Sequence, residues 1–247
     1  MERRVFEKHS RKNRELRIEA CIFDLDGTLI DSEPNYKASD GAFLASYGVR
    51  YDEEFNRAVM GRGAVELFRL IERNFPESAL NRMPMEERVR LKDEAYLAYA
   101  RGRTKAFPSM KALVERLSGQ GLPLALASGS SPAVIDFALG EAGLAGLFAV
   151  IVSASEVPRG KPEPDIFLEA SRLLGVSPGA CAVFEDSHNG VLAAYAAGMA
   201  CVALPESGFD APAFSRASRV FPGGPARASL DELLAALRDI GPLGPRE

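Results

Sequence analysis

The chain lacks several features that mark particular classes of protein. No stretch of its 247 residues approaches the roughly 20 consecutive apolar residues of a transmembrane helix. Its 30 basic and 34 acidic residues leave a net charge of only -4, so no overall field attracts nucleic acid or anionic lipid. The three cysteines are an odd number, which fits no secreted disulfide framework, and they are spaced too widely for a zinc cluster. We therefore expect a cytoplasmic protein that binds neither nucleic acid nor membranes, with Cys21, Cys181 and Cys201 reduced in its core.

The two ends of the chain differ in character from the rest. The first residues, MERRVFEKHSRKNRELRIEA, are charged and lack the apolar segment of a secretory signal, so we interpret residues 1–18 as a basic N-terminal arm. Residues 241–247 (GPLGPRE) are rich in proline and glycine and are expected to form a flexible tail. No sustained heptad repeat is present, and we expect a monomer.

Five short apolar runs recur along the chain, with helical patterns between them. Their residues are hydrophobic almost continuously and do not alternate, which is typical of strands covered on both faces in a parallel sheet. The alternation of strands and helices predicts an α/β fold with a doubly wound, mainly parallel, Rossmann-like sheet. The runs are EACIF (19–23), LPLALAS (122–128), FAVIVS (148–153), CAVF (181–184) and ACVALP (200–205).

One block interrupts this alternation. Residues 34–105 show helical spacing throughout and contain no convincing strand. The block is far too long for an ordinary connection between two strands. We interpret it as an inserted all-helical cap and assign residues 19–33 and 106–240 to the α/β core.

Polar residues follow the apolar runs at several places. In an open α/β sheet, ligands bind beyond the carboxyl ends of the strands. We therefore expect these side chains to meet at one edge of the sheet, although they are far apart in the sequence. They are Asp24 and Asp26 after the first run, Ser128 and Gly129 after the second, Lys161 in the loop RGKPEPDIF, and Glu185 and Asp186 after the fourth.

The charges of this group point to a metal and a phosphate. Four carboxylates in one place are tolerable only around a cation, and ligands that are all oxygen suit Mg²⁺. Lys161, with the hydroxyl and N–H groups of residues 128–130, would face an anion such as a phosphate. One aspartate can then attack phosphorus, because a carboxylate needs no deprotonation. The other can protonate the leaving oxygen and then activate water.

Four segments resemble, in order and spacing, the four motifs of the haloacid dehalogenase (HAD) superfamily. The resemblance spans about residues 19–205, and the block after the first motif looks like the helical cap of the first type. The subgroup that is most similar contains β-phosphoglucomutase and small sugar-phosphate phosphatases. The segments are DLDGT (24–28), LASGSS (126–131), GKPEPDIF (160–167) and FEDSHNGVLAAYAAGM (184–199).

The resemblance implies Mg²⁺-dependent transfer of a phosphoryl group to the chain. Asp24 would be the nucleophile and a metal ligand. Asp26 would be the general acid and base, and would bind Mg²⁺ through its backbone carbonyl. Ser128, the amide of Gly129 and Lys161 would hold the phosphoryl group. Asp186 would bind the metal directly, and Glu185 would bind it directly or through water.

Three further residues are considered for the site. Glu33 begins the connection to the cap, and Arg62 lies between glycines in VMGRG (59–63), where it would present a cation. Both are candidates for contact with substrate. Imidazole is a poor choice beside hard oxygen ligands, so we interpret His188 as a structural residue or one at the margin of the site.

The four motifs fit more than one function. A phosphatase lets water resolve the aspartyl phosphate, whereas a sugar phosphomutase returns the phosphate to another hydroxyl of the same sugar. The resembled mutases carry a histidine in the segment after the first motif, where this chain has Tyr36. We therefore predict a phosphatase for small phosphorylated metabolites, with sugar phosphates expected from the resemblance. A third hypothesis is a non-catalytic phospho-ligand binding protein, whose expected mark, a lost motif aspartate, is absent.

Overall fold

A computed structural model describes residues 17–52, 55 and 63–241. The predicted arm before residue 17, the predicted tail after residue 241 and the candidate Arg62 lie outside these residues. Ile18, which we placed in the arm, is fully buried and belongs to the core. Among the described helices, none is both long enough and apolar enough to cross a membrane.

The described part of the core contains a six-stranded sheet in which neighbouring strands run in parallel. Their order is β3-β2-β1-β4-β5-β6, so the chain extends from the central β1 first to one side and then to the other. The prediction of a doubly wound α/β fold is confirmed, and the sheet has one strand, β6, that no apolar run predicted. The strands are β1 (Ala20–Phe23), β2 (Leu124–Ser128), β3 (Val150–Ser153), β4 (Cys181–Glu185), β5 (Ala200–Ala203) and β6 (Arg219–Val220).

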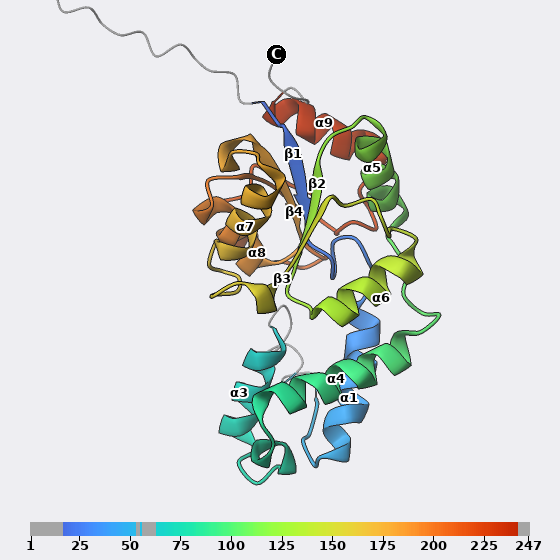
Figure 1. The fold of residues 1–247 in the computed structure, drawn as a ribbon, viewed down its shortest axis with the longest axis vertical. Helices are drawn as coiled ribbons and strands as arrows, with labels where there is room; N and C mark the ends of the chain where they lie inside the picture. The colour runs from blue at the N-terminus through green and yellow to red at the C-terminus, as the bar shows by residue number, and fades with distance from the viewer. Residues whose placement is uncertain (1–16, 53–54, 56–62, 242–247) are drawn as a thin grey trace, which may run out of the picture.

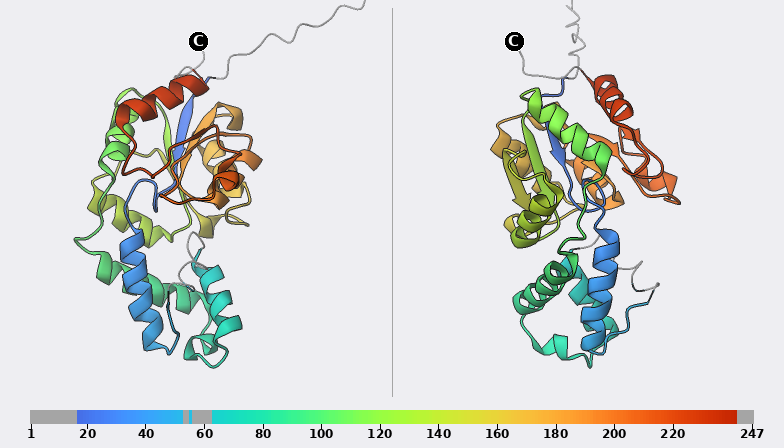
Figure 2. Two further views of the ribbon diagram at one scale, coloured as in Figure 1. Left: turned by 180° about the vertical axis from the view of Figure 1, so that it is seen from behind. Right: turned by 90° about the vertical axis from the view of Figure 1, so that its right-hand side faces the viewer.

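Helices cover both faces of the sheet, as Figures 1 and 2 show. Successive side chains of a strand point to opposite faces, so Cys21 and Phe23 join one buried cluster while Ala20 and Ile22 join the other. This double burial explains why the strands are apolar without alternation. Helices α5 (Pro108–Gly119), α6 (Pro132–Ala142) and α9 (Leu230–Ile240) pack on the first face, and α7 (Asp165–Leu174) and α8 (His188–Ala196) on the second.

Local signals explain where several helices begin and end. Ser131 accepts a hydrogen bond from the N–H of Val134 and begins α6, with a proline in the first turn. Ser229 begins α9 with a capping box. Gly143 and Gly175 end α6 and α7 at φ values of +65° and +69°, which favour glycine.

The cap forms a second body beyond the carboxyl ends of the strands (Figure 1). Its helices α1 (Glu33–Ser46), α3 (Ala64–Asn74) and α4 (Met85–Ala100) enclose a small core that includes Leu44, Phe68 and Ile71. Between residues 33 and 100 the described residues contain no strand. The cap touches the sheet domain where Tyr96 of α4 packs against Val134 of α6.

Candidate active site

The segment that follows β1 is bent back by its own apolar residues. Leu25 and Leu29 are fully buried, and the N–H of Leu29 donates to the carbonyl of Leu25 over 2.9 Å. Gly27 has a φ of +77°, and a Cβ at this position would lie 2.2 Å from Oδ2 of Asp186. Only glycine therefore fits between the two acidic segments. The N–H of Asp24 donates to the carbonyl of Phe184 over 3.0 Å, which ties the segment to β4.

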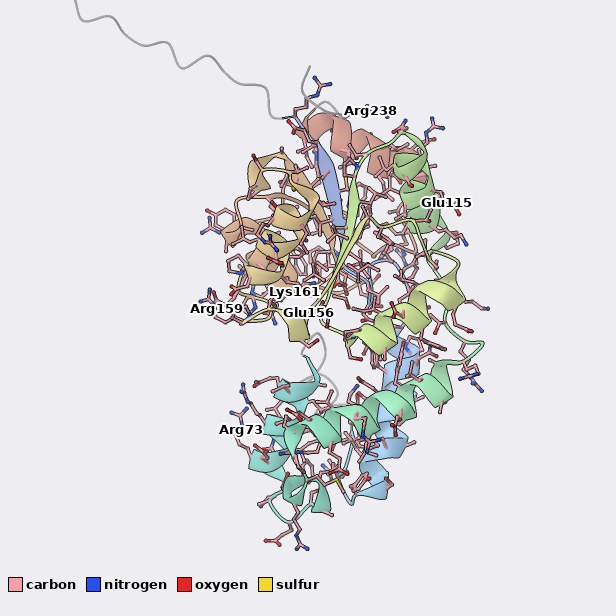
Figure 3. The ribbon with its side chains drawn as sticks, in the orientation of Figure 1. Arg73, Glu115, Glu156, Arg159, Lys161 and Arg238 are labelled. Atoms are coloured by element: carbon pink, nitrogen blue, oxygen red, sulfur yellow. The ribbon has the colours of Figure 1, made fainter. Side chains whose placement is uncertain are left out.

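Three carboxylates meet at the carboxyl ends of β1 and β4. One oxygen from each of Asp24, Glu185 and Asp186 lies within 4.8 Å of the others. The ammonium group of Lys161 lies 2.6 Å from Oδ1 of Asp24, 2.6 Å from Oε1 of Glu185 and 3.2 Å from the carbonyl oxygen of Ala127. Figure 3 labels Lys161 on the side of the core that faces the cap. Four residues expected at the site thus lie in direct contact or within a few ångströms of one another.

The cluster carries more negative than positive charge, and its pKa values reflect this excess. Burial raises the pKa of Asp24, Lys161 opposes that rise and Glu185 adds to it, which leaves a pKa of about 7. Burial, followed by the charges of Glu185 and Asp24, raises the pKa of Asp186 well above its usual range. Burial lowers the pKa of Lys161, but its two carboxylate partners raise this pKa by more than burial lowers it. The ammonium therefore stays charged. A divalent cation would offset the remaining negative charge, and three carboxylates are ligands that suit one.

Neighbouring residues orient the two acidic side chains at the end of β4. The N–H and the hydroxyl of Ser187 both donate to Oε2 of Glu185, over 2.8 and 2.9 Å. A Cβ on Gly190 would lie 1.8 Å from the Glu185 carboxyl carbon, so the side chain of Glu185 occupies the space that this glycine leaves. The hydroxyl of Thr28 donates to Oδ1 of Asp186 over 3.2 Å. The sequence analysis assigned no role to these three supporting residues, although a glycine in the first turn of a helix was a signal for close approach.

Two of the three residues expected to hold phosphate, Ser128 and Gly129, lie at the end of β2, which pairs with β1, and the third is Lys161. Ser128 is fully buried, and its hydroxyl accepts a hydrogen bond from the N–H of Ser130 over 3.1 Å. Gly129 is exposed. An ammonium group has three donors, and those of Lys161 face Asp24, Glu185 and a backbone carbonyl. A phosphoryl oxygen can therefore bond to Lys161 only by replacing one of these acceptors.

Asp26 is held apart from the three carboxylates. Its Oδ2 accepts a hydrogen bond from the hydroxyl of Ser130 over 2.7 Å, whereas its Oδ1 is buried and has no partner among the described residues. Burial raises the pKa of Asp26, and the hydroxyls of Ser130 and Ser32 partly oppose the rise. One of its oxygens is thus held by Ser130, and the other is buried without a hydrogen-bond partner among the described residues. The sequence analysis did not predict the contact with Ser130.

The remaining candidates are not part of this cluster. Glu33 is the first residue of α1 and is partly buried, and burial, then the charges of Glu206 and Asp26, raise its pKa. Its contact with substrate stays a prediction, and Arg62 lies outside the described residues. Nδ1 of His188 lies 2.7 Å from the carbonyl oxygen of Ala213, which gives this histidine a structural contact at the surface.

A parallel sheet with an inserted helical cap, and acidic residues with a lysine at the strand ends, defines a class of hydrolases. Residues 18–198 match the haloacid dehalogenase-like hydrolase family. Because this match covers well over half of the chain, the protein belongs to that family. The family membership that the motifs indicated is confirmed.

Three known proteins illustrate the relationship. The chain is 33% identical over 190 residues to the fructose-1-phosphate phosphatase YqaB of Escherichia coli strain K12, which covers 75% of this chain and 96% of that protein. It is 34% identical over 193 residues to a bifunctional riboflavin kinase/FMN phosphatase of Arabidopsis thaliana, covering 76% of this chain but only 49% of that relative, about half its length. The crystal structure of CbbY from Rhodobacter sphaeroides in complex with phosphate superposes with a TM-score of 0.78 at 28% identity, over 87% of this chain and 99% of that one.

Proposed function

We propose that this protein is a Mg²⁺-dependent phosphatase that hydrolyses small phosphorylated metabolites, sugar phosphates among them, through an aspartyl phosphate on Asp24. The observation that carries the proposal is the meeting of Asp24, Glu185 and Asp186 with Lys161 at the carboxyl ends of β1 and β4. Membership in the hydrolase family supports the same class of reaction. The relatives described above include phosphatases named for a sugar phosphate and for FMN.

The acidic cluster is suited to magnesium by its chemistry. Its ligand atoms are all carboxylate oxygens, and hard oxygen ligands favour Mg²⁺ over softer metals. Asp24, Asp186 and Glu185 would hold the ion, together with the backbone carbonyl of Asp26. When bound, magnesium would neutralise negative charge on the phosphoryl group as it is transferred.

The residues of the chain divide the two chemical steps between them. In the first step, a carboxylate oxygen of Asp24 attacks phosphorus while the ester bond breaks, and Asp26 gives a proton to the departing oxygen. In the second step, Asp26 removes a proton from water as the water oxygen attacks phosphorus, which releases phosphate and restores Asp24. Ser128 and Lys161 would orient the phosphoryl group throughout.

Tyr36 favours hydrolysis over the mutase reaction. This residue stands where the resembled mutases have a histidine. Burial, followed by the nearby charge of Asp26, raises the pKa of the Tyr36 phenol well above its usual range. The side chain therefore stays neutral near pH 7 and cannot exchange a proton as an imidazole does.

A panel of phosphorylated metabolites, assayed for release of inorganic phosphate, tests the proposal. We expect turnover with Mg²⁺, loss of turnover with excess EDTA, and a decrease of at least about 1000-fold in Asp24→Asn. Asp231→Asn is a matched control, because Asp231 lies exposed in the first turn of α9, a helix at the end of the core opposite to the cap (Figure 1). Phosphate release by Asp24→Asn at the wild-type rate would contradict the mechanism. Turnover that requires a bisphosphorylated sugar activator and converts one sugar phosphate to another would indicate the mutase instead.

A further inference from the structure

Tyr36 connects the cap to the core at one point. It lies on α1, and its hydroxyl is 2.9 Å from the hydroxyl of Ser130 in the loop after β2. Its ring stacks on that of Tyr96 of α4, with centroids 4.1 Å apart and planes at 20°. The ammonium of Lys92, also on α4, lies 4.7 Å from the centre of the same ring. Two cap helices therefore determine where the Tyr36 hydroxyl lies.

Ser130 connects Tyr36 to Asp26 by a second hydrogen bond. Its hydroxyl donates to Oδ2 of Asp26 over 2.7 Å. A serine hydroxyl has a single proton, so the hydroxyl of Tyr36 must be the donor toward Ser130. The backbone of Ser130 is also restrained, because its N–H donates to Oγ of Ser128 and its carbonyl accepts from Oγ of Ser153 over 2.7 Å. The hydrogen bonds form a continuous chain from the cap to the carboxyl group of Asp26.

This chain of hydrogen bonds distinguishes the two oxygens of Asp26. Oδ2 is occupied by Ser130, whereas Oδ1 has no hydrogen-bond partner among the described residues. A carboxyl group that acts as a general acid must aim one oxygen at the leaving group and keep that oxygen free. The hydrogen bond to Ser130 restrains the Asp26 carboxyl group through Oδ2 and leaves Oδ1 unpaired.

We propose that Tyr36 is a positioning residue for Asp26 and acts through Ser130, so that the cap orients the general acid of the core. The proposal rests on the proposed phosphatase function. In the step concerned, the proton of the Asp26 carboxyl group passes to the ester oxygen as its bond to phosphorus breaks and the bond from Asp24 to phosphorus forms, which leaves a neutral alcohol and an ionised Asp26. Tyr36 takes no part in the bonds that change.

Leaving-group dependence provides the test. The Tyr36→Phe variant keeps the ring that stacks on Tyr96 and loses only the hydroxyl. An aliphatic ester needs its leaving oxygen protonated, whereas p-nitrophenol leaves as a stable anion and needs little help from an acid. We expect Tyr36→Phe to lower kcat/KM about 10-fold for the aliphatic phosphate that the wild type hydrolyses fastest, and less than about 2-fold for p-nitrophenyl phosphate. The parameter kcat/KM isolates the first step, in which the leaving group departs.

Tyr99→Phe is the matched control, because Tyr99 lies on α4 with 38% of its surface exposed, and both substrates should be unaffected. Ser130→Ala removes the link itself, and we expect the Tyr36→Phe/Ser130→Ala double variant to be no slower than Ser130→Ala alone.

Each remaining result counts against the inference. Equal losses on both substrates, no loss on either, or additive effects in the double variant would overturn it while wild-type turnover leaves the proposed function standing. A wild-type protein that hydrolyses neither substrate would overturn both.

Discussion

Two lysines are buried among carboxylates, one in the core and one in the cap, and they differ in charge balance. Lys161 has 13% of its side chain exposed and contacts both Asp24 and Glu185 at 2.6 Å. Lys92 of α4 has 7% of its side chain exposed and lies 3.2 Å from Asp40 of α1, whose side chain is 9% exposed. Each lysine joins segments that are distant in the sequence. The core lysine contacts two carboxylates and has a third nearby, whereas the cap lysine has only Asp40 within ion-pair distance among the described residues, although its charge also lowers the pKa of Asp26 and Asp93.

The difference separates a reactive site from a structural contact. A buried pair of one ammonium and one carboxylate is neutral and needs no additional ion. Three carboxylates around one ammonium leave an excess of negative charge, and burial of this charge is costly. Burial and the neighbouring carboxylates together raise the pKa values of Asp24 and Asp186. The excess charge is what a divalent cation can satisfy. Unbalanced charge, and not burial alone, marks the core cluster as the candidate active site.

The largest effect should come from removing the core lysine. Lys161→Met deletes the only ammonium in contact with Asp24 and Glu185 among the described residues, and we expect turnover to fall about 100- to 1000-fold. Steady-state phosphate release measures the change. Lys111→Met is the matched control, because Lys111 is a core lysine whose ammonium donates only to the carbonyl of Ala142 in the described structure. A Lys161→Met enzyme with more than about a tenth of wild-type turnover would break the comparison.

Disrupting the cap pair should affect stability. Asp40→Asn leaves buried Lys92 without a carboxylate at ion-pair distance among the described residues, and we expect the free energy of unfolding to fall by about 3 kcal/mol. Chemical denaturation followed by circular dichroism measures the loss. The double variant Asp40→Leu/Lys92→Met, which removes both charges, should recover most of it. If the double variant is no more stable than Asp40→Asn, the pair is not the balanced structural contact described above.

The smallest effect concerns the residue that orients Glu185. Ser187→Ala and Ser229→Ala each remove a serine that caps a helix, and each should cost about 1 kcal/mol of stability. Only Ser187 also donates to Glu185, so only Ser187→Ala should weaken Mg²⁺ binding, by about 10-fold. The Mg²⁺ dependence of the thermal unfolding midpoint measures the affinity. Equal Mg²⁺ affinities in the two variants would show that the orientation of Glu185 does not matter.

Much of the fold was predictable from local pattern. The apolar runs around β1 and β4 are continuous because both faces of these strands are buried, and the double burial is visible in the sequence. β6 was missed because it has only two residues, Arg219 and Val220, and both are exposed. Its pairing depends on β5 being beside it, which no local pattern reveals.

The sequence predicted which residues lie near one another at the candidate site, but not which of them are in contact. Strand ends in a parallel sheet share one edge, so the motifs that carry Asp24 and Glu185 had to lie near each other. The link from Tyr36 through Ser130 to Asp26 could not be inferred, because it crosses 94 residues and then 104 residues of sequence. The catalytic roles of these residues stay predictions until they are measured.

The sequence by itself determined the alternation of strands and helices, the presence of an inserted helical block and the acidic and basic residues available at the strand ends. The spacing of hydrophobic residues, the positions of glycines and the chemistry of each side chain are local properties, so they can be read from the sequence without the fold. Only the tertiary structure decided that Lys161 contacts two carboxylates while Lys92 contacts one, and which oxygen of Asp26 accepts the hydrogen bond from Ser130. Hydrogen bonds form only over a narrow range of donor–acceptor distances and angles, and only the packed chain sets the distances between remote segments that finely.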